Sequence, residues 1–335
     1  MTDETAYRRV LHAYPPDCQP QRAEFLGGAG GFSGALFWRL QTPRGLLCLR
    51  CWPREHPSRQ RLEFIQAVLW HVSQEGFRRV PLALETRTHA GYVCESGRLW
   101  ELAPWLPGKA DYRQSPSAER LQAALTTLAE FHLAAASFPL PDRGPALVPG
   151  IRERFERVED LSAERFERLA DAVAPGDWPE LAWRAREWRA LAPRAIPRVR
   201  SLLARAAELA APLQPCIRDI WHDHVLFAGQ QVAGLVDFGA MRADNVAGDI
   251  ARLLGSLAGD DRQAWERGLA AYTSLRPLSP DETYLVAAFD QANTLLAGLS
   301  WLEWIYLERR QFSDRQAVIE RLDANLPRLT TLAGE

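Results

Sequence analysis

The feature that most constrains the fold is a pair of short apolar runs flanked by acidic residues near the middle of the chain. Residues 225–227 and 232–236 are apolar, and four turn-forming residues separate them. This pattern predicts a β-hairpin. Because a hairpin brings its two ends together, we expect Asp219 and His224, which precede the first strand, to lie near Asp237, which follows the second.

The side chains expected at the hairpin mouth have a specific chemical use. Two carboxylates and an imidazole can supply a ligand for a divalent cation and a general base. In phosphoryl transfer the protein mainly positions the nucleophile and stabilises the charge that spreads over the phosphate oxygens. The stretch therefore predicts a site for phosphoryl transfer.

The order of these residues resembles the aminoglycoside phosphotransferase and choline kinase-like family. Asp219 is followed five residues later by His224, then by the run Asp237-Phe238-Gly239 and by Asp249-Ile250-Ala251. The resemblance implies that Asp219 is the catalytic base, that Asp237 binds the metal ion and that Asp249 braces the catalytic loop. It also implies an ATP-dependent phosphotransferase that acts on a hydroxyl of a small molecule.

His224 departs from the family pattern, which has a metal-binding asparagine at this position. Mg²⁺ prefers oxygen ligands, whereas imidazole is better suited to Zn²⁺, Mn²⁺ or Fe²⁺. His224 then either orients water or phosphate, or binds the metal ion beside Asp237, with Mn²⁺ as an alternative to Mg²⁺. A third outcome is lost activity, which would leave a kinase-like protein that only binds a nucleotide or another ligand.

A rival prediction comes from a different class of enzyme. The run Trp221-His222-Asp223-His224 contains the His-x-His spacing of a transition-metal site for hydrolysis. It has no recognisable third ligand at helical spacing.

The resemblance implies an α+β fold like that of protein kinases, with two lobes. The smaller lobe, residues 1–103, contains an antiparallel sheet and binds the nucleotide, and the larger lobe, residues 104–335, is mostly helical. Two early strands, residues 23–26 and 32–40, enclose a glycine-rich turn. Glycine lets backbone N–H groups approach phosphate oxygens closely, and the glycines predicted to do so are Gly27, Gly28, Gly30 and Gly31.

The third predicted strand, residues 46–52, carries Arg50 where kinases have the lysine that binds the α- and β-phosphates. An exposed arginine without such a role is the alternative. Residues 57–74 follow with the apolar spacing of a helix. Glu63 is our candidate for the helix carboxylate that pairs with Arg50, and Glu55 is the other.

Two further strands, residues 92–95 and 99–103, complete a predicted sheet of about five strands. The resemblance implies that the backbone from Glu101 to Ala103 contacts the nucleotide. The rest of the chain is predicted to be mainly helical, and the resemblance implies that its last helices shape the acceptor pocket. The candidate lining residues are Asp290, Trp301, Glu303 and Trp304.

Composition excludes several alternatives. Lys109 is the only lysine, which rules out a P-loop that ends in Gly-Lys-Ser/Thr. Cys48 and Cys51 lie in a predicted strand at an odd separation, which should point their side chains to opposite faces rather than at one metal ion. The net charge of −2 predicts no nucleic-acid or membrane partner. Five cysteines without regular spacing and the absence of an apolar run of membrane-spanning length predict a cytoplasmic protein.

Overall fold

The computed structural model describes residues 3–28, 34–141, 144–161, 163–173, 178–312 and 314–334. The chain forms two compact units. The first contains Met1–Phe138 and His222–Arg242, and the second contains Pro139–Trp221 and Ala243–Glu335. The predicted lobe boundary between residues 103 and 104 falls inside the first unit, and the division into functional lobes stays a prediction.

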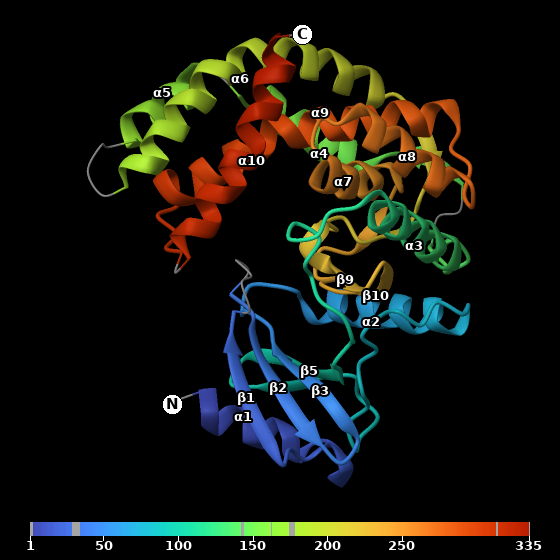
Figure 1. Ribbon diagram of the computed structural model, residues 1–335. Helices are drawn as coiled ribbons and strands as arrows, with labels where there is room; N and C mark the ends of the chain where they lie inside the picture. The colour runs from blue at the N-terminus through green and yellow to red at the C-terminus, as the bar shows by residue number, and fades with distance from the viewer. Residues whose placement is uncertain are drawn as a thin grey trace. The chain divides into compact units, whose positions relative to one another are not determined.

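A five-stranded antiparallel sheet dominates the first unit (Figure 1). Its strands follow the order β1-β2-β3-β5-β4, which confirms the predicted sheet. The strands are β1 (Arg22–Gly27), β2 (Leu36–Thr42), β3 (Gly45–Cys51), β4 (Val93–Glu95) and β5 (Arg98–Pro104).

Alternation along β3 gives the sheet one apolar and one functional face. Leu47, Leu49 and Cys51 are buried in the core that the sheet forms with α1 (Asp3–His12). Cys48 and Arg50 point to the opposite face, because successive side chains of a strand alternate. Neither Cys48 nor Cys51 forms a disulfide.

Helix α2 (Arg59–Gln74) follows the third strand. Its N-terminus is capped by Ser58, whose hydroxyl accepts a hydrogen bond from Arg61 N at 3.2 Å. Its buried side chains are the ones that the apolar spacing predicts: Leu62, Ile65, Val68, Leu69 and Val72. Helix α3 (Ala118–Ala136) packs on α2 and on the hairpin strand β10 (Gln231–Leu235).

The predicted hairpin is present and belongs to the first unit. Strands β9 (Val225–Ala228) and β10 pair antiparallel, from Ala228 opposite Gln231 to Val225 opposite Leu235. Gly229 turns the chain with φ +63°, a conformation that glycine adopts without strain. The hairpin thus places the residues just before β9 beside those just after β10.

The second unit is built mainly from helices, with α9 (Pro280–Leu302) at its centre (Figure 1). It packs against α4, α6, α7 and α10, and buried residues cover most of its circumference, as expected for a helix that is apolar all round. A π-helical turn, η3 (Glu303–Leu307), continues α9, where the sequence predicts regular helix to residue 310. The remaining elements are β6 (Pro145–Leu147), α4 (Pro149–Glu159), α5 (Ala163–Ala172), α6 (Pro179–Ala206), β7 (Ala210–Pro212), β8 (Gln214–Cys216), β11 (Arg242–Asp244), α7 (Ala247–Ala258), α8 (Arg262–Thr273) and α10 (Arg315–Gly334).

Gly298 allows α9 to approach α6 closely. A Cβ at this position would lie 2.3 Å from Trp188 Cδ1. The Trp188 indole N–H donates to Leu295 O at 3.2 Å and is thereby satisfied in the core. Across the described residues, none of the helices is both long and apolar enough to span a bilayer.

Candidate active site

The hairpin brings His224 and Asp237 together at its open end. Val236 N donates to His224 O at 3.0 Å, and His224 Nε2 lies 3.5 Å from Asp237 Oδ2. This part of the prediction is confirmed. Both side chains can coordinate a cation, so the hairpin mouth in the first unit is a candidate metal centre.

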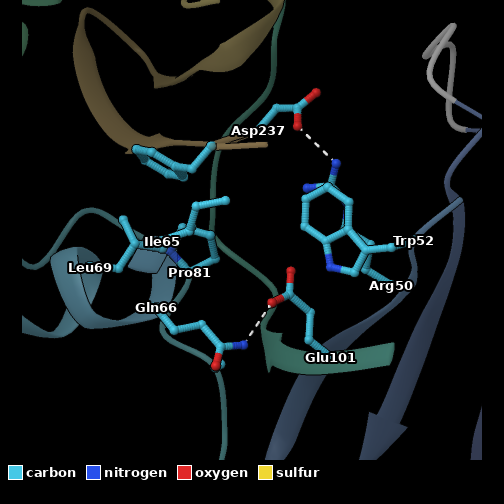
Figure 2. Close-up of a pocket in the computed structure, with 10 residues that line it drawn as sticks. Arg50, Trp52, Ile65, Gln66, Leu69, Pro81, Glu101 and Asp237 are labelled. Carbon is cyan, nitrogen blue, oxygen red and sulfur yellow. Dashed lines mark hydrogen bonds and ion pairs between the residues drawn. The ribbon is translucent and has the colours of Figure 1, made fainter. Parts of the chain in front are cut away.

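The other oxygen of Asp237 binds Arg50. Arg50 Nη2 donates to Asp237 Oδ1 at 2.8 Å (Figure 2). Burial raises the pKa of Asp237, but Arg50 and His224 outweigh it, and the pKa is lowered from 3.8 to about 2. Asp237 also has φ +61°, a left-handed conformation that non-glycine residues seldom adopt and that clusters at functional sites.

Arg50 is held in place by aromatic rings as well. Its guanidinium carbon lies 3.3 Å from the centre of a Trp52 ring and 5.2 Å from that of Phe37. Such stacking is typical of arginine and limits its freedom. The side chain is only 12 % exposed, which argues against the alternative of an exposed arginine without a role.

The predicted pairing of Arg50 with Glu63 is wrong. Glu63 lies on the exposed side of α2, where it accepts a hydrogen bond from Tyr92 Oη at 2.7 Å. Glu55 is exposed too, and Arg50 binds Asp237 instead. The polar α2 residue that lines the same cavity as Arg50 is Gln66, since helix phase places residue 66 nearer to the buried stripe than residue 63.

Glu101 lies opposite Arg50 on the neighbouring strand β5. Its Oε2 accepts a hydrogen bond from Gln66 Nε2 at 3.1 Å (Figure 2). Burial raises the pKa of the Glu101 carboxyl, although Arg50 and Gln66 act in the opposite direction. The structure thus encloses a second acidic group, besides Asp237, close to Arg50.

A small cavity lies among these side chains. Its volume is about 30 Å³, enough for a water molecule and far too little for a nucleotide. Arg50 Nε is buried there without a hydrogen-bond acceptor. The residues around it are Arg50, Trp52, Ile65, Gln66, Leu69, Pro81, Ala83, Glu101, Asp237 and Phe238.

The glycine turn is described only in part. Gly27 ends β1 with φ +60°, and apart from its chain neighbours no atom of the described residues lies within 4 Å of the place a Cβ would take. Gly28 follows it, whereas Gly30 and Gly31 lie outside the described residues. Ala103 of β5 is paired with Cys48 of β3. Strand β4 pairs with β5 only as far as Trp100, so it does not pair with Ala103. The predicted nucleotide contacts of these residues stay predictions.

Asp219 belongs to the second unit, where Arg252 of α7 holds it. Arg252 Nε and Nη2 both donate to Asp219 Oδ1, at 3.2 and 3.1 Å. The Asp219 side chain is 52 % exposed, so solvent or a substrate can reach it. Its predicted approach to Asp237, a residue of the first unit, stays a prediction.

Asp249 braces the loop that carries Asp219. Its carboxylate is fully buried and accepts hydrogen bonds from Ile217 N at 2.7 Å and Arg218 N at 2.6 Å. Arg218 has φ +69°, and its side chain binds Glu153 and Asp244. The brace that the resemblance implies is therefore present.

The predicted acceptor-lining residues fall into two separate clusters of the second unit. Asp290 binds Arg328 at 2.7 Å, and Glu303 binds Arg157 and Arg165. The rings of Trp301 and Trp304 lie 5.2 Å apart and perpendicular, next to Glu303 in the chain. Contact with an acceptor stays a prediction for all four.

The His-x-His alternative gains no support. His222 is buried and lies 3.5 Å from Asp223, whereas His224 faces Asp237. Within the described ranges, no group of three metal-ligating side chains includes either histidine. A transition-metal site of that kind would need a third ligand.

Comparison with known proteins connects this geometry to a family. Residues 25–282 match the family described as the phosphotransferase enzyme family. A homoserine kinase of Methylobacterium nodulans is 28 % identical, over 84 % of this chain and 81 % of that protein.

Solved structures with the same fold are more distant in sequence. A microcompartment-associated aminopropanol kinase is 16 % identical, with a TM-score of 0.67 over 98 % of this chain and 95 % of that one. Amicoumacin kinase hAmiN, solved with AMP-PNP and Ca²⁺, is 13 % identical, with a TM-score of 0.63 over 97 % and 93 %. These likenesses confirm the predicted kinase-like fold class.

Proposed function

Because this chain belongs to the phosphotransferase enzyme family, we propose that Asp219, Asp237 and Arg50 divide the work of phosphoryl transfer among them. Family membership over residues 25–282 is the observation that carries the activity itself: the protein is a small-molecule kinase that phosphorylates a hydroxyl group with ATP. Nothing in the comparisons favours the catalytically impaired alternative.

Asp219 is the proposed base for the acceptor hydroxyl. A general base must be reachable by the proton it accepts and must be held in a fixed orientation. Asp219 meets both needs, since half of its side chain is exposed and Arg252 fixes Oδ1. The buried Asp249 supports the same loop from beneath through two backbone N–H groups.

Asp237 is the proposed ligand of a divalent cation, with His224 beside it. Mg²⁺ is usually held by one or two carboxylates together with phosphate oxygens and water, which suits a single ionised Asp237. His224 adds a nitrogen donor that suits Mn²⁺ better. A bound cation would neutralise charge on the phosphates. The AMP-PNP and Ca²⁺ complex of amicoumacin kinase hAmiN supports the use of ATP and such a cation.

Arg50 is the proposed phosphate-binding residue, assisted by backbone N–H groups of Gly27, Gly28, Gly30 and Gly31. A guanidinium can bind phosphate oxygens in a fork. Aromatic stacking on Trp52 keeps the Arg50 side chain within reach of Asp237. The backbone of Glu101 and Ala103 is the proposed contact for the nucleotide base.

The acceptor that we propose carries an amino group besides the hydroxyl. The relatives support this class, because homoserine and aminopropanol are both amino alcohols in the wider sense. An assay of ADP release with homoserine, aminopropanol and an aminoglycoside as acceptors, and with hydroxyl compounds that lack an amino group, tests it. A turnover stimulated only by hydroxyl compounds without an amino group would contradict the proposed class.

The variant Asp219→Asn tests the proposed base. We expect turnover to fall by about 10² to 10⁴-fold, the usual contribution of a general base, while ATP affinity stays nearly unchanged. Steady-state ADP release and calorimetric titration with ATP measure the two quantities.

A nearby acid provides the matched control. Asp223 is 46 % exposed and faces His222, so Asp223→Asn should keep most of the activity. Unchanged turnover in Asp219→Asn would remove Asp219 from the mechanism.

A further inference from the structure

Arg50 has an acidic neighbour on its own sheet. In the register of β3 and β5, Arg50 is directly opposite Glu101. Directly opposite residues of an antiparallel pair have their Cβ atoms about 5 Å apart on the same face, so the two side chains interact. Both line the same small cavity (Figure 2).

The helix contributes an amide to this arrangement instead of an acid. Gln66 Nε2 donates to Glu101 Oε2 at 3.1 Å and to Gly91 O at 3.0 Å. The amide therefore fixes the carboxylate of Glu101 and ties α2 to β5. Glu63, the acid that the sequence offers on α2, accepts a hydrogen bond from Tyr92 instead.

We propose that Glu101 is the positioning residue for Arg50, held in place by Gln66, so that the acidic partner of the phosphate-binding arginine comes from strand β5 and not from helix α2. This inference rests on the proposed function, because it assigns Arg50 to the phosphates.

The reason for a second acid lies in the two tasks of Asp237. Asp237 makes the direct ion pair with Arg50 and is also the proposed cation ligand. If Asp237 were the only acid near Arg50, the guanidinium would stay bound to the Asp237 carboxylate and compete with the cation for it. Glu101 attracts the Arg50 guanidinium from the neighbouring strand β5. Charge interactions between directly opposite residues remain substantial in a partly buried site.

The buried atoms around the cavity agree with this role. Arg50 Nε lies buried at the same cavity as the Glu101 carboxylate and has no acceptor. Buried donors are usually satisfied directly or through water. The cavity has the volume for a water molecule that links Arg50 Nε to the acid.

The variant Glu101→Gln separates a positioning role from a structural one. Gln keeps the shape and an oxygen that can accept from Gln66, but it removes the charge. We expect Glu101→Gln to weaken ATP binding about tenfold and to leave adenosine binding within twofold. Adenosine has no phosphates, so a general disturbance of the pocket would weaken both ligands alike. Calorimetric titrations with ATP·Mg²⁺ and with adenosine measure both affinities.

A double-mutant cycle with Arg50→Met makes the test specific for Arg50. Once Arg50 is removed, Glu101→Gln should have no further effect on ATP affinity, because the acid acts only through the arginine. Glu101→Asp, which keeps the charge on a shorter stem, should retain part of the ATP affinity and serves if Glu101→Gln does not fold. Glu95→Gln on β4, which removes a surface ion pair with Arg9, is the matched control and should bind ATP like the wild type.

Three results would overturn the inference while leaving the proposed function intact: wild-type ATP affinity in Glu101→Gln, an equal loss for adenosine, or the same loss in the Arg50→Met background. A wild-type protein that binds no ATP with Mg²⁺ or Mn²⁺ would overturn the proposed function and this inference together.

Discussion

Asp237 lies between two basic side chains, and its ionisation should affect stability as well as function. Arg50 binds one oxygen at 2.8 Å, and His224 lies 3.5 Å from the other. The pKa of Asp237 is lowered from 3.8 to about 2 in the folded protein. A lowered folded-state pKa stabilises the folded state above the unfolded-state pKa, and this stabilisation is lost as the pH falls toward 2.

The variant Asp237→Asn tests this at the residue scale. We expect a lower Tm than the wild type at pH 7, and the difference should shrink as the pH falls from about 5 to about 2. Thermal unfolding followed by circular dichroism measures it. Glu266→Gln, at an exposed position of α8, controls for loss of a surface charge. A difference in Tm that stays constant over this range would contradict the role of Arg50 and His224 in holding the ionised form.

At the scale of the element, the loop before the hairpin depends on one buried carboxylate. Asp249, at the start of α7, accepts both Ile217 N and Arg218 N. Asp249→Ala would leave the buried Ile217 N–H and the partly buried Arg218 N–H unsatisfied. An unsatisfied buried N–H costs about 1 to 3 kcal/mol, so we expect a loss of roughly 3 kcal/mol in the free energy of unfolding. Urea denaturation measures the loss.

A helix cap provides the comparison for this variant. Asp261 caps α8 by accepting from Ala264 N at 3.0 Å, and Asp261→Ala should cost only about 1 kcal/mol. Equal losses in the two variants would show that Asp249 acts as an ordinary cap. Asp249→Ala should also lower the turnover of the enzyme, because the backbone of the loop that carries Asp219 would lose both hydrogen bonds.

The elements that the sequence predicts well are those whose signal is local. The hairpin follows from two apolar runs and a turn, and the pairing of Val225 with Leu235 then determines where His224 meets Asp237. The buried stripe of α2 follows in the same way from the spacing of Leu62, Ile65, Val68, Leu69 and Val72. Such patterns record which face of an element is buried, and they need no knowledge of its partners.

The contacts that sequence patterns miss are those between distant side chains. Around the α2 helix, residue 66 lies roughly 40° from Leu62 and residue 63 roughly 100° from it. As the helix partner of Arg50, however, an acid at 63 is chemically more expected than an amide at 66. Arg252 follows the Asp-Ile-Ala run directly, but its contact with Asp219 depends on how α7 packs. A closer look at helix phase could have found Gln66, whereas nothing local indicates the partner of Arg252.

At the scale of the whole molecule, the chain leaves and re-enters each compact unit. The hairpin, residues 222–242, belongs with the amino-terminal residues, although the flanking segments belong to the second unit. Asp219 therefore precedes a change of unit by only a few residues, and Asp237 lies just before the return. The proposed base therefore belongs to the second unit, whereas the proposed cation ligand belongs to the first.

Binding of nucleotide and cation should raise the free energy of unfolding of the protein. A ligand that binds only the folded state at 100 times its Kd contributes about 2.7 kcal/mol, so ATP with Mg²⁺ or Mn²⁺ should raise the Tm by several degrees. EDTA should remove part of the increase in Tm, because the proposed cation would link the phosphates to Asp237.

His224→Asn replaces a nitrogen donor by an oxygen and should favour Mg²⁺ over Mn²⁺ relative to the wild type. Thermal unfolding with each cation measures these shifts, with Asp219→Asn as the variant expected to behave like the wild type. An increase that is the same with EDTA as with either cation would mean that nucleotide binding in this protein does not involve a cation at the hairpin mouth.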